Sequence, residues 1–424
     1  MFFGRLYRIF LSSQKQAQVF NAFFSAGGDV QSLREVVNRV VGPILQATVA
    51  TPEIHFVRHG HHPEGFRGGW SSHSLSRLGE VQSSLLAERL RREGTVVDTL
   101  ISSDLPRAAD TAEILAQALN VAVSPAAEWR EVDNGVLAGM PEEQAQAMYP
   151  GLYWSSLEPD QPYPGGESPA AFHRRIEGAF RNLCDRILRG QIGPRVMVVM
   201  HGGPIRVVLS LVEGTPWSNK GPSTRVHETG VFSLAWTGET WSVTHEDDVA
   251  HLAGLGVRPL PGPAGEIHTI IHPLVTGDIE QFMAWRATDY YLANWARKEI
   301  QEHRDGKRIL LVAEASGQLV GTVQFVPNHE DSDLADGKTT AYLEALEGRE
   351  DFRKRGLGTW LVTSVERLAV EQGFRRLTLM VEPDNVPALS LYQRLGFTAF
   401  KNSSEIWRGK PLALLCMEKM LLER

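Results

Sequence analysis

The feature that most constrains the fold of this chain is an alternation of short apolar runs with amphipathic stretches between residues 52 and 252. The apolar runs have the length and the β-branched content of buried strands, and they lie at 53–59, 99–104 and 195–201. Helical spacing of apolar residues follows at 79–93, 106–119, 168–190 and 203–213. Alternation of this kind predicts an α/β domain over 52–253 with a mostly parallel sheet.

The rest of the chain divides into three further regions. Residues 1–51 carry an apolar stripe at helical spacing, and we expect this helical extension to pack on the chain itself. A docking face for a homo-oligomer is the open alternative. The Gly- and Pro-rich segment 254–265 predicts a linker. Residues 266–424 predict a strand, two helices, a hairpin turning at 316–318 and further strands and helices, which is an α+β pattern.

Composition excludes several classes of protein. The chain has 424 residues and a formal net charge of −7, which argues against a nucleic-acid-binding partner. Its two cysteines, Cys184 and Cys416, exclude a disulfide framework. No apolar run approaches the ~18 residues of a membrane span, and the N-terminus lacks the pattern of a signal peptide. We therefore expect a cytoplasmic protein without a membrane partner.

Polar residues end three of the predicted strands. Arg58 and His59 close the first, and His201 with Gly202 closes the strand at 195–201. The third leads into a helix whose first turn holds Arg107. Because sites in α/β sheets form at the carboxyl ends of strands, these side chains are expected in one crevice.

The chemistry that suits this set is phosphoryl transfer through a histidine. Arg58 and Arg107 can neutralise phosphate oxygens, and a protonated His201 can donate a further hydrogen bond. A neutral His59 can attack phosphorus. The leaving alkoxide needs a proton donor, for which Glu131 is our candidate. Glu128 and Asp133 lie close enough in sequence to be alternatives.

These residues lie in a series of motifs that resembles the histidine phosphatase superfamily, which includes cofactor-dependent phosphoglycerate mutase. The pieces are FVRHG (56–60), SLSRLGEVQ (74–82), SSDLPRAADTA (102–112), WREVDNGVLAG (129–139), PGGES (164–168) and VVMHGGPIRVVL (198–209). The resemblance implies a three-layer α/β/α fold, a phosphohistidine at His59 and no metal. The short stretch between Glu131 and His201 favours the phosphatase branch over the mutases. Arg67 and Ser71 are candidates for a further phosphate contact, and Trp70, Tyr153 and Trp154 for the pocket walls.

The C-terminal region contains a second anion-binding pattern. Three basic residues and two glycines, RKRGLGT at 353–359, precede an amphipathic helix. Glycines allow backbone amides to approach an anion, and the positive end of a helix favours a pyrophosphate there. This stretch resembles the cofactor motif of GNAT-type N-acetyltransferases. Residues 381–400 resemble the second signature of that family, and residues 407–421 resemble its last strands.

That resemblance implies acetyl-CoA bound between two splayed strands of a mixed sheet, with an amine as acceptor. The strand around Leu346 would pair with the pantetheine arm, and Tyr392 would protonate the departing thiolate. Glu344 is a candidate base. The expected cofactor-binding residues are Leu346, Arg353, Arg355, Gly356, Leu357, Gly358, Thr359, Asn385 and Tyr392.

The sequence therefore predicts a bifunctional enzyme that hydrolyses a small-molecule phosphate ester and acetylates an amine. Two alternatives stay open for the N-terminal half. It could be a non-catalytic phosphate sensor attached to an acetyltransferase, or it could transfer phosphate as phosphoglycerate mutases do.

Overall fold

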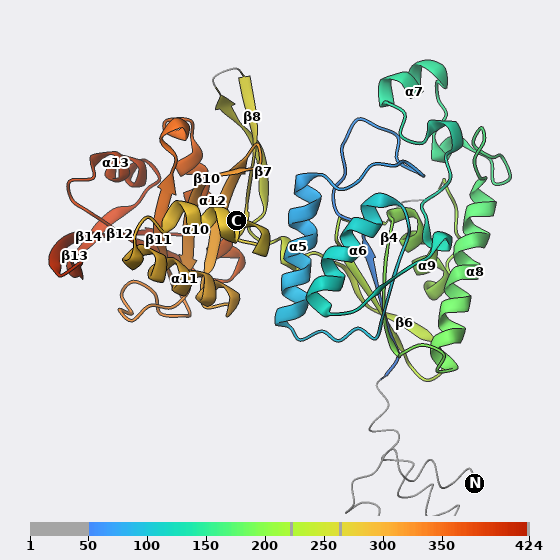
Figure 1. Ribbon diagram of the computed structural model, residues 1–424, viewed down its shortest axis with the longest axis horizontal. Helices are drawn as coiled ribbons and strands as arrows, with labels where there is room; N and C mark the ends of the chain where they lie inside the picture. The colour runs from blue at the N-terminus through green and yellow to red at the C-terminus, as the bar shows by residue number, and fades with distance from the viewer. Residues whose placement is uncertain (1–50, 221–223, 263–264, 422–424) are drawn as a thin grey trace, which may run out of the picture.

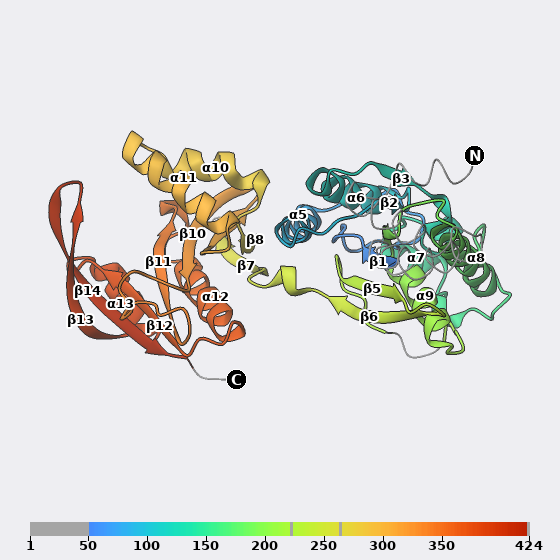
Figure 2. The same ribbon diagram turned by 90° about the horizontal axis from the view of Figure 1, so that it is seen from below.

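The structure of the protein is a computed structural model that describes residues 51–220, 224–262 and 265–421. The helical extension predicted for 1–51 therefore lies outside the described residues except for residue 51. The described chain forms two units, each built on one β-sheet, and they lie side by side along the long axis (Figures 1 and 2). Among the described helices, none has the length and apolar character needed to cross a membrane.

The N-terminal unit contains a six-stranded sheet in the order β3-β2-β4-β1-β5-β6. Its strands are β1 (Glu53–Arg58), β2 (Thr99–Ser102), β3 (Val123–Pro125), β4 (Arg195–Met200), β5 (Val231–Trp236) and β6 (Trp241–Asp248). The first four pair in parallel, as the alternation predicted, while β5 and β6 add an antiparallel edge that the sequence did not reveal.

Helices cover both faces of this sheet. They are α5 (Arg77–Arg92), α6 (Pro106–Leu119), α7 (Glu142–Met148), α8 (Pro169–Leu188) and α9 (Gly202–Glu213). Alternate residues of β4 point to opposite faces: Val196 and Val198 pack with α8 and α9, while Met197 and Val199 pack with α5 and α6. The predicted three-layer α/β/α arrangement is confirmed.

The C-terminal unit contains an eight-stranded sheet in the order β13-β14-β12-β11-β10-β9-β8-β7. Its strands are β7 (Gly256–Gly262), β8 (Gly265–Pro273), β9 (Ile309–Ala315), β10 (Gln318–Val326), β11 (Thr340–Gly348), β12 (Arg376–Val381), β13 (Thr398–Trp407) and β14 (Lys410–Met420). Its helices are α10 (Ile279–Arg286), α11 (Tyr290–Arg304), α12 (Leu357–Glu371) and α13 (Val386–Arg394). Side chains of α12 pack on one face of the sheet, and those of α10 and α11 pack on the other.

The segment 254–265, predicted as a linker, is instead mostly a strand. β7 occupies Gly256–Gly262 and pairs with β8 at the edge of the C-terminal sheet. Pro259 and Pro261 fit there because an edge strand has one side without ladder hydrogen bonds. The composition of this segment indicated a linker because Gly and Pro are typical of linkers. The same residues are tolerated in an edge strand, so composition alone does not separate the two.

The sheet splays between β11 and β12. These strands pair in parallel only from Thr340 to Leu343, although β11 continues to Gly348. The pairing of β11 with β10 shifts register between Thr322 and Gln324, and Ala345 on the opposite strand has a φ of 52°. The irregularity bends β11 away from β12, so the predicted mixed, splayed sheet is confirmed.

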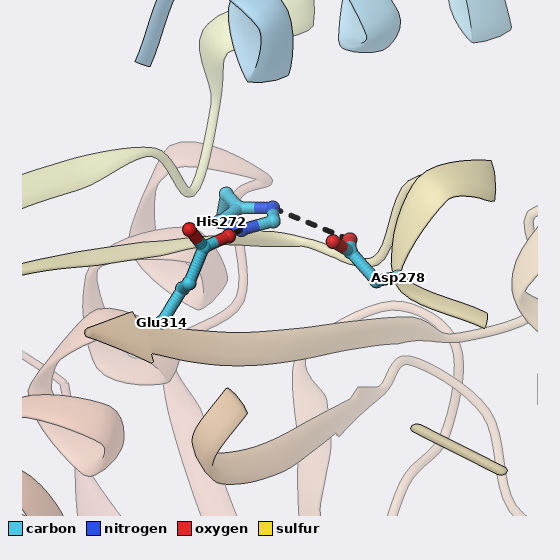
Figure 3. Close-up of side chains that lie close together, drawn as sticks. All are labelled: His272, Asp278 and Glu314. Carbon is cyan, nitrogen blue, oxygen red and sulfur yellow. Dashed lines mark ion pairs between the residues drawn. The ribbon is translucent and has the colours of Figure 1, made fainter. Parts of the chain in front are cut away.

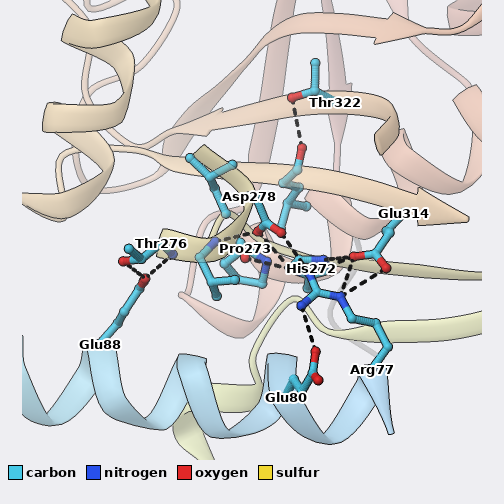
Figure 4. Close-up of polar contacts among 12 residues, drawn as sticks. Arg77, Glu80, Glu88, His272, Pro273, Thr276, Asp278, Glu314 and Thr322 are labelled. Atoms are coloured by element: carbon cyan, nitrogen blue, oxygen red, sulfur yellow. Dashed lines mark hydrogen bonds and ion pairs between the residues drawn. The ribbon is translucent and has the colours of Figure 1, made fainter. Parts of the chain in front are cut away.

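A buried ionic cluster joins the two units. Arg77, at the start of α5, donates from Nε to both carboxylate oxygens of Glu314, at 3.1 and 2.9 Å. Its Nη2 donates to Asp278 Oδ1 at 3.0 Å. Figure 4 shows Arg77 reaching from α5 into the C-terminal unit, where it meets Glu314 of β9. Val81, Leu85 and Val275 extend this contact as an apolar patch.

The same cluster has the composition of a metal site. His272, Asp278 and Glu314 offer ligand atoms within 4.8 Å of one another, and they are the one such group in the described residues (Figure 3). The ring nitrogens of His272 lie 3.8 Å from each carboxylate. Because Arg77 binds both carboxylates, its guanidinium supplies positive charge to this group. The expectation that the protein needs no metal stays a prediction.

Candidate functional site

Three parallel strands of the N-terminal sheet direct polar residues to one edge. β1, β4 and β2 are neighbours, so their carboxyl ends meet there. His59 follows β1 and His201 follows β4, and their ring centroids lie 5.0 Å apart. Arg107 begins the helix after β2, and its Nε lies 3.1 Å from Nε2 of His59. A pocket of about 170 Å³ at this edge is lined by His59, Arg107 and Arg58 among others.

The protonation state of His59 follows from its surroundings. Its Nδ1 lies 2.7 Å from the carbonyl oxygen of Gly60, which accepts a hydrogen bond, so Nδ1 carries the proton. Nε2 then carries the lone pair and faces Arg107. Burial, followed by the charges of Arg107 and Arg58, holds the pKa of His59 well below the ordinary value. His59 is therefore a neutral base with its nucleophilic nitrogen beside a guanidinium.

The two arginines are fixed by different partners. Arg107 is buried and donates from Nη1 to Ser71 Oγ at 3.2 Å and from Nη2 to the Gly69 oxygen at 2.8 Å. Burial lowers its pKa to about 10, which leaves it a cation at neutral pH. Arg58 pairs with Glu228 at 2.8 Å. Both guanidinium groups are thus held in place before a ligand arrives.

His201 is the second histidine of this pocket edge. It is fully buried, and its Nε2 lies 2.8 Å from Ser103 Oγ. Its buried Nδ1 has no hydrogen-bond partner within the described part of the chain. Burial, followed by the charge of Arg107, holds the pKa of His201 well below the ordinary value. A phosphate oxygen bound beside His59 is a partner that this nitrogen would suit.

Glu131, the predicted proton donor, lies at the same pocket. Its Oε2 accepts a hydrogen bond at 3.1 Å from the Gly203 amide, in the first turn of α9. A β-carbon at Gly203 would lie 2.1 Å from Glu131 Oε1, so only glycine permits this approach. Glu131 lines the pocket beside His59, whereas neither Glu128 nor Asp133 lines it.

The structure adds two residues that the sequence analysis did not assign to the phosphate site. His62 lines the pocket with its ring centroid 5.4 Å from that of His59, and Arg206 lines it from α9. Arg206 follows Gly202 by four residues, and this helical spacing could have identified it. Of the two residues proposed for a further phosphate contact, Ser71 binds Arg107 instead, and Arg67 pairs with Glu142 outside this pocket.

A larger cavity of about 550 Å³ adjoins the pocket and shares Glu131 and Arg206 with it. Its aromatic wall is formed by Trp154, Phe172 and Trp217, whose ring centroids lie 5.5 to 6.5 Å apart. Trp154 was a predicted wall residue. Trp70 lies outside the cavity and instead donates to the Glu131 carbonyl oxygen at 2.7 Å.

The C-terminal unit places its glycine-rich turn at the start of α12. Gly356 caps this helix with a φ of 87°, a conformation that favours glycine. The amides of Leu357, Gly358 and Thr359 form the first turn, where a helix presents free N–H groups. Two of the predicted basic residues have other partners: Arg355 donates to the Pro261 oxygen at 2.9 Å, and Arg353 pairs with Glu350.

The other predicted residues of this unit lie around the splayed strands. Leu346 lies on β11 beyond the last pair with β12. Asn385 caps α13 by accepting a hydrogen bond from the Ala388 amide at 3.2 Å. Tyr392, on α13, is buried against Phe397, and burial raises its pKa to about 12. Glu344 accepts a hydrogen bond at 3.0 Å from Arg308, and burial raises its pKa.

Comparison with protein families gives the same division of the chain. Residues 54–248 match the model of the histidine phosphatase superfamily (branch 1), and residues 278–397 match that of the acetyltransferase (GNAT) family. The chain carries a histidine phosphatase domain and a GNAT domain. The two resemblances found in the sequence are thereby confirmed, and both families support enzyme activity.

Relatives match the phosphatase domain. The "Probable phosphoglycerate mutase GpmB" of Salmonella paratyphi B is 29% identical over 209 residues, which cover 47% of this chain and 94% of that protein. A mycobacterial glucosyl-3-phosphoglycerate phosphatase is 22% identical with a TM-score of 0.40, covering 47% of this chain and 99% of that one. The α-ribazole phosphatase of Shigella flexneri is 19% identical with a TM-score of 0.42, covering 47% and 97%.

The contact between Glu131 and Gly203 gives a test of the proton donor in the phosphatase domain. Replacing Glu131 with glutamine keeps the shape of the side chain but removes the acidic proton, so phosphate release from an alkyl ester should fall about 10²- to 10⁴-fold. An ester with a good leaving group, such as p-nitrophenyl phosphate, should lose much less in its first step because its phenolate needs no proton. Asp133→Asn is the matched control. Equal losses in the first step, followed as release of the alcohol or phenol, would contradict the role.

Proposed function

We propose that the phosphatase domain hydrolyses a phosphate monoester through a phosphohistidine at Nε2 of His59. The neutral ring, its Nδ1 proton directed to Gly60 and its Nε2 beside Arg107, is the observation that carries this proposal. Nε2 attacks phosphorus, the ester P–O bond breaks, and Glu131 gives its proton to the leaving alkoxide. Water then attacks phosphorus with Glu131 as base, the P–N bond breaks, and inorganic phosphate leaves.

The arginines and His201 would bind the phosphoryl oxygens throughout both steps. Arg58 and Arg107 supply two fixed positive charges, and Gly202 lies in the same pocket at the uncapped start of α9. The buried Nδ1 of His201 gains the partner that it lacks. Because these groups are positioned before binding, little reorganisation is needed when charge develops on the phosphoryl group.

The adjoining cavity supports an ester whose alcohol part is a ring or another bulky group. It shares Glu131 and Arg206 with the small pocket, so a leaving group that accepts a proton from Glu131 could extend into it. Trp154, Phe172 and Trp217 offer flat apolar surface for stacking. We therefore place the phosphate in the 170 Å³ pocket and the alcohol in the 550 Å³ cavity.

For the GNAT domain we propose acetyl transfer from acetyl-CoA to an amine. The unpaired edge of β11 after Leu343 can hydrogen-bond an extended pantetheine arm, and the first turn of α12 can bind the pyrophosphate. The Tyr392 hydroxyl, protonated at neutral pH, would give a proton to the departing thiolate sulfur. Glu344, whose pKa burial raises, would accept a proton from the amine.

The two proposed activities are tested together with the full chain. Phosphate release is measured over a panel of monoesters that contrasts ring alcohols with small polar alcohols, and free thiol release from acetyl-CoA is measured over a panel of amines. We expect the phosphate to be released to water, with no phosphorylated alcohol formed as a product. We also expect esters of ring alcohols to react faster than esters of small polar alcohols. A product that retains phosphate on a second hydroxyl would instead indicate mutase activity. A chain without either activity would contradict the proposal.

Replacing Tyr392 with phenylalanine tests the proton donor of the GNAT domain. Phenylalanine retains the packing against Phe397 and removes only the hydroxyl, so the fold should be unchanged. We expect kcat for acetyl transfer to fall about 10²-fold or more while KM for acetyl-CoA stays within about twofold. Phosphate release serves as the internal control. An unchanged kcat would assign Tyr392 to core packing alone.

A further inference from the structure

A further cavity lies between the two domains and is distinct from the two pockets of the phosphatase domain. Its volume is about 280 Å³. The phosphatase domain contributes the second half of α5 and the turn around His251, and the GNAT domain contributes the end of α11 and the start of β9. The cavity exists only because the two domains are joined, so neither family alone accounts for it.

Positive charge gathers in this cavity from both domains. Arg91 and Arg92 line it from α5, and Arg304 and Arg308 line it from the GNAT domain. Arg308 pairs with Glu302 and Glu344. In contrast, no hydrogen bond or ion pair in the described part of the chain engages the guanidinium groups of the other three.

The positive charges of these arginines exceed the negative charge in the cavity lining. Glu88 is the one acidic residue among the described lining residues, and it accepts hydrogen bonds from the amide and hydroxyl of Thr276 at 2.8 and 3.1 Å. Arg92 and Arg304, which come from different domains, both line the cavity. Burial is the main cause that lowers the pKa of His303, and the charges of both arginines add to it.

We propose that this cavity binds a small dianionic tetrahedral oxyanion, either inorganic phosphate or the head of a phosphate monoester. Guanidinium groups on opposite walls can donate forked hydrogen bonds to such an anion. A volume of 280 Å³ holds a phosphate with room for water. This inference does not depend on the proposed catalytic roles.

The walls of the cavity connect to both proposed sites. His251 Nε2 lies 2.8 Å from Thr229 Oγ1, and the Thr229 amide donates to the Arg58 carbonyl oxygen at 3.0 Å. On the other wall, Arg308 donates to Glu344 at 3.0 Å, and its own buried Nε has no partner in the described residues. An anion bound here would contact residues one step from the phosphate pocket and from the candidate base.

The test counts phosphate binding to the full chain by equilibrium dialysis. The variant carries Arg92→Gln with Arg304→Gln, and Arg297→Gln on the exposed part of α11 is the matched control. We expect the double variant to lose one equivalent of bound phosphate, whether the parent binds one or two, while its phosphatase and acetyltransferase activities show that it is folded. Each single variant should weaken that site about tenfold.

Three probes identify the ligand class: inorganic phosphate, sulfate and phenylphosphonate, which carries the same dianionic head on a P–C bond that cannot be hydrolysed. Phosphate binding without phenylphosphonate binding assigns the site to free phosphate, and the reverse assigns it to a monoester. Binding should weaken as salt concentration rises. Unchanged stoichiometry and affinity of the double variant for both phosphate and phenylphosphonate would overturn the proposal.

Discussion

Replacing His59 with alanine is expected to abolish phosphate release, with a loss of about 10⁴-fold or more. The expected loss is this large because His59 is the proposed covalent nucleophile. Removing it eliminates both chemical steps of the reaction, whereas removing a binding residue would weaken only one contact. Acetyl transfer by the same chain should be unchanged, because His59 lies in the phosphatase domain. The measurement is single-turnover phosphate release, with a parallel thiol assay on the same preparation.

The control for this variant is His245→Ala, which removes an exposed histidine from β6 of the same domain. It should retain full activity. If His59→Ala keeps more than about a hundredth of the parent rate, water would be attacking phosphorus directly and the covalent route would be wrong. Trapping the parent chain during turnover should show one phosphate bound per chain, and the variant should show none.

The same role fixes the pH dependence of the parent enzyme. His59 must be neutral to attack, and burial together with Arg107 and Arg58 lowers its pKa below the ordinary value of 6.5. Its unprotonated form is therefore complete at neutral pH and is lost only as pH falls through the lowered pKa. The acidic limb of kcat/KM should lie below pH 6.5 in the parent enzyme.

Local sequence patterns predicted the parts of the fold that are set by local physics. β4 is buried over nearly its whole length and reads as a continuous apolar run, while β1 and β2 are marked by short groups of buried apolar residues. The helices show their buried faces as periodic stripes, and α6 matches its predicted bounds of 106–119. The candidate site follows from the same logic, because strand ends in a parallel sheet meet at one edge.

What the sequence did not predict depends on distant partners. Ser71 turned out to bind Arg107, and no local pattern distinguishes that from a phosphate contact. The edge strand β7 was missed because its prolines also fit a linker. The interdomain cluster joins residues more than 200 positions apart, which a single sequence cannot reveal.

Replacing Arg77 with alanine is expected to destabilise the chain by about 3–5 kcal/mol. Glu314 and Asp278 are 4% and 1% exposed, and Arg77 is the cation hydrogen-bonded to both. Without it, two carboxylates remain buried with His272, 3.8 Å from each, as their remaining source of positive charge in the described residues. This is far more costly than losing a surface pair. Chemical denaturation of the full chain, followed by hydrogen exchange of β8 and β9, would measure the loss.

Two comparisons separate this charge effect from lost packing. Arg181→Ala breaks an exposed pair with Glu177 and should cost about 0.5 kcal/mol or less. Adding Glu314→Gln and Asp278→Asn to Arg77→Ala should recover most of the loss, because neutral amides need no counter-charge. Failure of this rescue would assign the effect to packing of the arginine stem.

The pH dependence of the Arg77 variant follows from the same charges. In the parent, burial opposes ionisation of Glu314, but His272 and Arg77 hold its pKa at about 2, below the ordinary value of 4.5. That contribution to stability is present above pH 4.5 and is lost as pH falls toward 2. In the variant the pKa of Glu314 rises above that of the unfolded chain, and the pKa of Asp278, which burial already raises in the parent, rises further, so protonation now favours the folded state. The deficit against the parent should therefore shrink between pH 7 and pH 4.5, and a constant deficit would exclude charge as its cause.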